Sequence, residues 1–168
     1  MSVLDSALEL LGEKGLAKQE GRIAFQKLVL LMQMARNESG YRFLWGLFGP
    51  YSATLAEDMH DRLAQSLAGE PTPAKNEVLE EVKSVCAGYA PDLSSYETLE
   101  LLTSYLYVRD RLQMTPEAAI EFLENNPRKR ELVEKLAGSK DRPERITLLE
   151  DCSSKLLSLN SIQGKQAN

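Results

Sequence analysis

The sequence predicts a mainly α-helical domain, in which seven or eight helices form one compact orthogonal bundle with a short β element at about residues 41–48. Three observations support this fold class. Apolar residues recur at three- and four-residue spacing along most of the chain, capping residues and prolines divide these repeats, and one aromatic segment alternates instead. The 168 residues are near the commonest domain size and can bury a core without disulfides.

Apolar periodicity and capping signals give the position of each helix. We expect helices at about residues 2–15, 22–37, 52–69, 74–89, 94–112, 115–125, 127–138 and 141–159. The second has few polar positions and should lie near the centre of the core. Thr72 with Pro73, and Thr115 with Pro116, place a cap and a first-turn proline at two helix starts. The whole of 1–161 is expected to be one helical domain, followed by a frayed tail over 162–168.

Residues 41–48 (YRFLWGLF) are expected to form the β element. Tyr41, Phe43, Trp45 and Leu47 fall on one face of an alternating pattern, and aromatic side chains favour a pleated surface. Gly49 and Pro50 should end this strand. Its backbone groups need a partner, which could be the polar connector at 16–22 or a second copy of the chain.

The cysteines and the apolar segments indicate the cellular compartment in which the protein is expected. Cys86 and Cys152 are far apart and form no CxxC pattern, so we expect two buried, reduced thiols. The first residues carry acidic groups and no basic stretch before an apolar one, unlike a signal peptide. No apolar run approaches the roughly 20 residues that a bilayer span needs. We therefore expect a cytoplasmic protein without a membrane partner.

The charge of the chain is unevenly distributed. Its net charge is −5, but residues 1–126 hold 11 basic and 19 acidic side chains, whereas residues 127–145 hold seven basic and four acidic ones. Arg128, Lys129 and Arg130 are the candidate phosphate contacts in this basic stretch. Cations in a first helical turn oppose the macrodipole, so either an acidic partner or an intrachain match to the acid-rich residues 1–126 could favour them. A nucleic-acid-binding surface normally carries an excess of positive charge, so the acidic remainder disfavours nucleic acid as a partner.

A search for catalytic groups finds little. His60 is the single histidine, and Glu57, His60 and Asp61 lie within one helical turn, where they could belong to a carboxylate–histidine metal site. The simpler interpretation is a solvated polar helix face. Zinc spacings, HExxH, Walker and GxGxxG motifs are absent, so we expect no cofactor and no enzyme.

An aromatic turn is the most distinctive segment of the chain. Five aromatic residues fall within the eleven positions from Tyr41 to Tyr51, although only 7% of the chain is aromatic. These side chains could simply belong to the core. A turn between a strand and a helix usually reaches the surface, however, and tyrosine is enriched in interfaces. The candidate partner-binding residues are therefore Trp45, Phe48, Gly49, Pro50, Tyr51 and Ser52, with Ser52 also expected as a helix cap.

Two short motifs carry a family resemblance. Residues 26–28 (Gln-Lys-Leu) and 49–52 (Gly-Pro-Tyr-Ser), within the segment 22–67, resemble the YwgA-like prokaryotic proteins. They are also distantly similar to the Panacea (SocA-like) antitoxin domain. The resemblance implies a compact helical fold with a small β element and, in the antitoxin branch, neutralisation of a toxin by direct contact.

Three functional hypotheses follow. The leading one is a non-catalytic protein-interaction module, antitoxin-like or regulatory, which binds another protein or a second copy of itself through the aromatic turn. The alternative is a winged-helix-like nucleic-acid-binding regulator, because two helices, a strand and a sharp turn occupy the N-terminal end. The third is a metal-dependent enzyme that uses the Glu57, His60 and Asp61 face.

Overall fold

A computed structural model gives the fold of the chain and describes residues 1–65 and 77–165. Over these residues the protein is mainly helical, with one small antiparallel sheet. The elements are α1 (Val3–Leu16), α2 (Gln19–Ala35), β1 (Leu44–Gly46), β2 (Gly49–Tyr51), α3 (Ala53–Gln65), α4 (Glu77–Cys86), α5 (Ser95–Asp110), α6 (Pro116–Glu124), α7 (Pro127–Ala137), α8 (Arg142–Leu157) and α9 (Asn160–Gln163).

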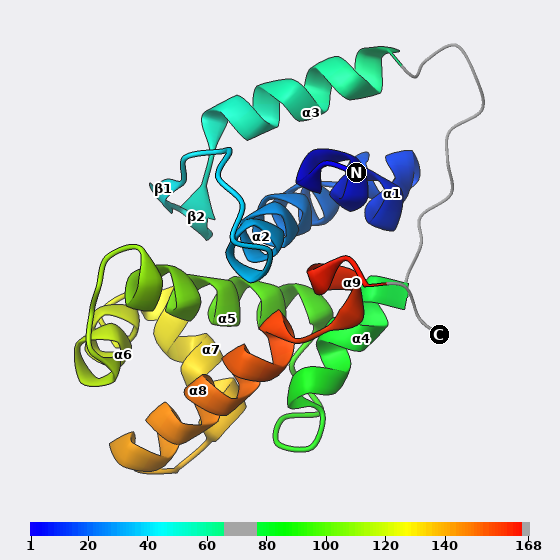
Figure 1. Ribbon diagram of the computed structural model, residues 1–168. Coiled ribbons are helices and arrows are strands. Elements are labelled where there is room, and N and C mark those ends of the chain that lie inside the picture. Colours follow the sequence, from blue (N-terminus) through cyan, green and yellow to red (C-terminus); the bar gives the residue numbers. More distant parts are fainter. Residues whose placement is uncertain (66–76, 166–168) are drawn as a thin grey trace.

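Two helices, α2 and α5, form the centre of the bundle (Figure 1). Every residue of α2 from position 24 to position 33 is buried, as the sequence predicts for its apolar run. Helix α5 packs against α2 on one side and against α4, α6, α7 and α8 on the others. Cys86 and Cys152 are buried free thiols in this core, which confirms that expectation. Within the described ranges no helix is both long and apolar enough to cross a bilayer.

Three predicted helix starts, those of α5, α6 and α8, are confirmed. Ser94 and Glu97 form a complete capping box at the start of α5, because each side chain bonds the backbone of the other residue. Thr115 caps α6 and Asp141 caps α8, each followed by a proline within the first two helical positions. The expected cap Thr72 and its Pro73 lie outside the described residues.

The β element predicted at 41–48 is confirmed by β1, but its extent and its pairing partner differ from the prediction. The chain forms a hairpin instead, with β1 over residues 44–46 and β2 over residues 49–51. Gly49 and Pro50 do not end the strand but belong to its partner, in the register Trp45 opposite Pro50 and Gly46 opposite Gly49. Neither the 16–22 connector nor a second copy is needed to pair β1. Gly49 has a φ of 94°, and this left-handed backbone lets the turn close.

Two other boundaries differ from expectation. Helix α2 begins at Gln19, inside the segment expected as a connector, and a side chain at Gly21 would meet the carbonyl oxygen of Gly15 at 1.9 Å. The glycine therefore permits α1 and α2 to pack closely. Residues 162 and 163, expected in the frayed tail, belong to α9, because Ile162 is fully buried and its carbonyl accepts a hydrogen bond from Arg36 Nε at 3.1 Å. Residues 166–168 of the predicted tail lie outside the described residues.

Candidate functional site

The hairpin has one face toward the protein and one toward solvent. Trp45 and Pro50 are cross-strand neighbours on the inner face, where Pro50 is buried and Trp45 is half-buried. Leu44 and Tyr51 are cross-strand neighbours on the outer face, and they are 60% and 49% exposed. Leu47 at the turn is 79% exposed. Three large apolar side chains of one short hairpin thus face water.

Two glutamines of α2 hold the two ends of the hairpin segment. Gln26 accepts a hydrogen bond from the Ser52 amide and donates one to the Ser52 carbonyl, both at 2.9 Å. Gln33 does the same for Tyr41, with distances of 2.8 and 3.1 Å. Residues seven apart lie on the same helical face, two turns away from each other. Each glutamine side chain therefore bonds one residue's N–H and C=O groups, as a neighbouring strand would. Without these bonds the backbone groups would lack partners.

Lys27 adds a third buried contact between α2 and the hairpin. Its Nζ donates to the Pro50 carbonyl at 2.6 Å, and the residue is only 2% exposed. Burial, aided by the neighbouring charge of Lys129, lowers the pKa of Lys27 to about 7, while Glu100 acts in the opposite direction. The Gln26-Lys27 motif and the Gly49–Ser52 motif, which carry the family resemblance, are thus direct contact partners.

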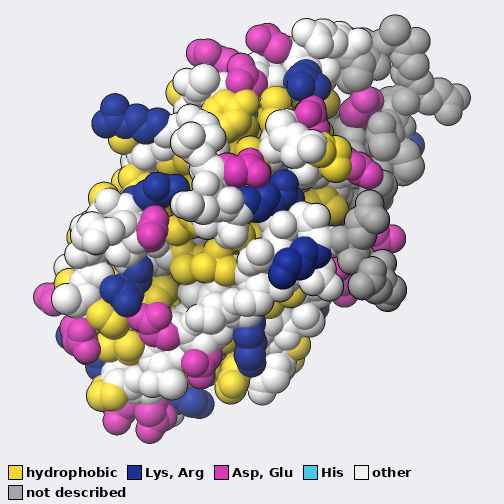
Figure 2. Space-filling model, viewed as in Figure 1, with side chains coloured by type: hydrophobic (Ala, Val, Ile, Leu, Met, Phe, Trp, Pro, Cys, Tyr) yellow, Lys and Arg dark blue, Asp and Glu magenta, His cyan; other side chains and the backbone are white. Residues whose placement is uncertain are grey.

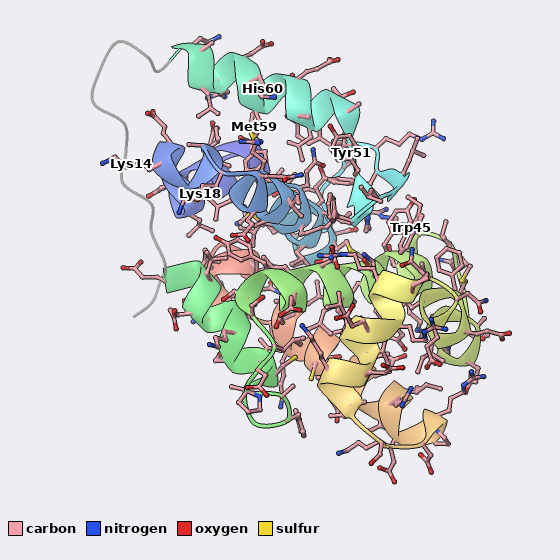
Figure 3. The ribbon with its side chains drawn as sticks, turned by 180° about the vertical axis from the view of Figure 1, so that it is seen from behind. Lys14, Lys18, Trp45, Tyr51, Met59 and His60 are labelled. Carbon is pink, nitrogen blue, oxygen red and sulfur yellow. The ribbon has the colours of Figure 1, made fainter. Side chains whose placement is uncertain are left out.

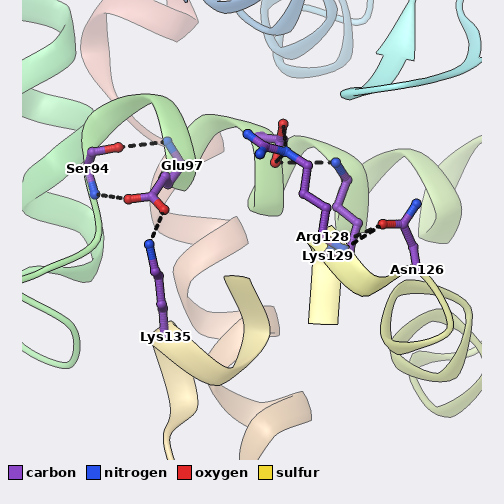
Figure 4. A network of polar contacts seen from close by, with 7 residues as sticks. Ser94, Glu97, Asn126, Arg128, Lys129 and Lys135 are labelled. Atoms are coloured by element: carbon purple, nitrogen blue, oxygen red, sulfur yellow. Dashed lines mark hydrogen bonds and ion pairs between the residues drawn. The ribbon is translucent and has the colours of Figure 1, made fainter. Parts of the chain in front are cut away.

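Glu100 on α5 organises a second polar cluster with Arg128 and Lys129 of α7, whose side chains extend toward α5 in Figure 4. Arg128 Nε lies 2.9 Å from both carboxylate oxygens of Glu100, and Lys129 Nζ lies 3.4 Å from one of them. Glu100 is 2% exposed and Lys129 is fully buried. Because burial disfavours a charged amine, the pKa of Lys129 is lowered as well. Cations in the first turn of α7 therefore have an intrachain acidic partner.

This geometry corrects the predicted phosphate contacts. Lys129 is enclosed by protein and cannot reach a phosphate at the surface, whereas Arg128 is engaged by Glu100. Arg130 remains exposed. On the face drawn in Figure 2, basic and acidic side chains are interspersed rather than gathered into a basic patch. The second helix of a helix-turn-helix reads the major groove, but α2 is buried over positions 24–33 and has no such face to offer.

Some aromatic side chains of the hairpin pack against the protein, and another is exposed to solvent. The Trp45 ring packs edge-on against Phe122, with ring centroids 5.1 Å apart, and it also lies near Tyr107 and the Lys129 ammonium. The Phe48 ring lies under the Arg128 guanidinium at 5.2 Å. Gly49, Pro50 and Ser52 are buried, and Ser52 caps α3 by accepting from the Leu55 amide. Of the six predicted contact residues, Tyr51 is the one that is largely exposed, and the expectation of exposed backbone at 49–52 is wrong.

The sequence pattern did not reveal Leu44 and Leu47 as surface residues. Alternation placed Leu47 on the same face as Phe43 and Trp45, and that face is inward for Phe43. The chain reverses at residues 47 and 48, so the Leu47 side chain projects into solvent instead of packing against the protein. The available signal was a glycine placed to follow the turn, because Gly49 has the positive φ that a hairpin needs directly after a type I turn.

The proposed metal ligands do not converge in the structure. Glu57, His60 and Asp61 are all exposed on α3. Among residues 1–65 and 77–165, no three His, Cys, Asp or Glu side chains come together in a way that could hold a metal ion. The geometry therefore gives the metal-enzyme hypothesis no support.

Comparisons of this chain with protein-family models, curated proteins and solved structures give no match. Functional inference must therefore rest on the geometry of the chain itself.

Proposed function

We propose that the protein is a non-catalytic protein-interaction module that binds its partner through the outer face of the β-hairpin. The observation that carries this proposal is the exposure of Leu44, Leu47 and Tyr51 on a hairpin fixed to the core. Apolar side chains gathered on one protruding element favour binding to another protein, since association removes them from water. A pre-ordered hairpin also loses little conformational entropy on binding.

The anchoring contacts explain why the hairpin is suited to this role. Strands of three residues in an isolated hairpin are marginal in water. Here Gln26, Gln33 and Lys27 hold the backbone of the segment, and Trp45 is packed against aromatic rings. Contacts of the inner face thus stabilise the hairpin, while the outer face makes few contacts with the rest of the protein. An antitoxin-like or regulatory role, in which the hairpin contacts and restrains a partner protein, fits such a surface.

The test is capture of a partner followed by reconstitution from purified components. The wild-type chain is used to isolate a stoichiometric partner from its native cells, and the Kd is then measured by calorimetry. The variant Leu44→Ser, Leu47→Ser, Tyr51→Ser removes the outer face. We expect its affinity to fall by about a hundredfold or more, since central apolar contacts dominate interface energies.

The matched control changes an exposed aromatic residue elsewhere. Tyr89 is 48% exposed, and its ring lies near Lys155 of α8 rather than near the hairpin. The variant Tyr89→Ser should retain wild-type affinity. Equal affinity of the hairpin variant and the wild type would overturn the proposal. If the partner is a second copy, the wild type and the control variant should dimerise as the concentration rises in sedimentation experiments. The hairpin variant should then remain monomeric.

A further inference from the structure

A cavity of about 420 Å³ lies between α2, the hairpin and α3. Residues from all three elements line it, including Arg22 and Lys27 from α2, Phe48 and Tyr51 from the hairpin, and Met59 and His60 from α3. Figure 3 shows Met59 and His60 on the part of α3 that faces α2, with Tyr51 toward the hairpin end. The volume is within the range of pockets that hold small molecules.

The lining of this cavity combines apolar side chains with basic ones. Ile23, Phe48 and Met59 give it an apolar wall, while Arg22, Lys27 and His60 add groups that can carry positive charge. None of the described residues that line it is an aspartate or a glutamate. This absence is informative because the chain as a whole has a net charge of −5. The electrostatic character of the cavity is thus opposite to that of the protein.

Lys27 is the buried charged group of this lining. An ammonium has three donors, and the contact with the Pro50 carbonyl uses one of them. Glu100, the acidic group whose charge acts on Lys27, is already bonded by Arg128 and paired with Lys129. Burying an ammonium without sufficient negative charge is unfavourable, as the lowered pKa of Lys27 indicates. An anion in the cavity would supply the missing charge.

Helix α3 is suited to admit a ligand because it is held by few buried side chains. Leu55 and Met59 are the two buried residues among its described side chains. Among the described residues, the polar contacts that join it to other segments include one from Tyr41 to Asp58 at 2.7 Å and one from Arg62 to Asp5 at 2.9 Å. The opposite wall, formed by α2, is part of the core. A ligand between them would add apolar contacts to the more weakly packed side.

We propose that this cavity binds a small organic carboxylate with an apolar body, the carboxylate pairing with Lys27 and Arg22 and the apolar body packing on Ile23, Phe48 and Met59. Arg22 donates from one terminal nitrogen to the carbonyls of Leu16 and Ala17, and the other guanidinium donors remain for a ligand. This site goes beyond the protein-interaction proposal and does not depend on it, although Leu47 and Tyr51 belong to both surfaces.

The test compares octanoate with octanol on the purified chain without any partner. Calorimetry should give a Kd for octanoate in the millimolar range or tighter, and octanol should bind at least about tenfold more weakly, because a charge-assisted hydrogen bond is lost. Lys27→Met should reduce octanoate affinity by about tenfold or more and leave octanol binding nearly unchanged.

A second pair of variants tests the location without altering the buried charges. Ala56→Trp fills the cavity from α3 and should abolish octanoate binding, whereas Ala64→Trp on the exposed part of the same helix should not. Three results would overturn the inference: no octanoate binding by the wild type, equal affinity for octanoate and octanol, or undiminished octanoate binding by Ala56→Trp. Because no partner protein is present, these results leave the protein-interaction proposal to be judged separately.

Discussion

The two halves of this protein obtain their order in different ways. Around α5, helices begin at standard caps and bury regular apolar faces, with Ser94, Thr115 and Asp141 as the capping residues. Around the hairpin, the chain has two three-residue strands and the helix α3, which buries few side chains. Hydrogen bonds from side chains of α2 therefore hold the backbone of this region in place. A surface built this way can expose apolar side chains while its backbone stays fixed.

The largest effect should come from the polar cluster that joins these halves. Replacing Glu100 by glutamine keeps the volume but leaves Lys129 buried without its counter-charge. We expect the free energy of unfolding to fall by about 3–5 kcal/mol, measured by urea denaturation. Glu121→Gln, at an exposed position of α6, is the control and should change it by less than about 0.5 kcal/mol. A small loss for Glu100→Gln would mean that water already compensates the Lys129 charge.

The next effect concerns the glutamine that holds the end of the hairpin. Gln26→Ala leaves the buried amide and carbonyl of Ser52 without partners. Each unsatisfied group is costly, so we expect a loss of about 2–4 kcal/mol in the same measurement. Gln65→Ala, which truncates an exposed glutamine of α3, should have almost no effect. Equal stability of the two variants would show that the glutamine contact does not hold the hairpin.

The buried Lys27 predicts a dependence of stability on pH. Its pKa is about 7 in the folded protein and 10.5 when exposed, so between these values the unfolded chain binds more protons than the folded one. The free energy of unfolding should therefore rise with pH above 7, by at most about 1.4 kcal/mol per pH unit from this group.

The slope between pH 7 and pH 9 is compared with that of Lys27→Met. The variant keeps Lys129, whose pKa is also lowered, so the contribution of that group is common to both proteins. The wild-type slope should be the steeper one. Identical slopes would contradict the assignment of a lowered pKa to Lys27.

The smallest effect is expected at the exposed side of the hairpin. Leu47 is 79% exposed, so Leu47→Ser should change the free energy of unfolding by less than about 0.5 kcal/mol. A loss of more than about 1 kcal/mol in urea denaturation would mean that Leu47 supports the fold. In that case its exposure would be no argument for binding.

The sequence predicts the α5 side better than the hairpin side for a physical reason. Helix starts depend on local residues, and Ser94 with Glu97 or Thr115 with Pro116 can be recognised without knowledge of the fold. The buried glutamines cannot, because Gln26 and Gln33 stand in an apolar run and their partners are up to 26 residues away. Likewise, Ile162 looks solvent-exposed in a polar tail until α9 is seen to pack on α2.

The candidate site shows the same limit. Aromatic crowding at residues 41–51 predicted an aromatic side chain at the surface, and Tyr51 is 49% exposed, but alternation could not indicate which side of the hairpin faces water. Lys129 was a candidate phosphate contact because it lies in a basic stretch of the sequence. Its burial follows from its pairing with Glu100, 29 positions earlier, which no local pattern reveals.

The central claim is that buried polar contacts from α2 hold rigid a hairpin whose other side is open to a partner. Native-state hydrogen exchange at the Ser52 amide tests this most directly, because that amide donates to Gln26. The account predicts exchange only through global unfolding in the wild type, and exchange through local opening in Gln26→Ala. An opening free energy near zero at Ser52 in the wild type would contradict it.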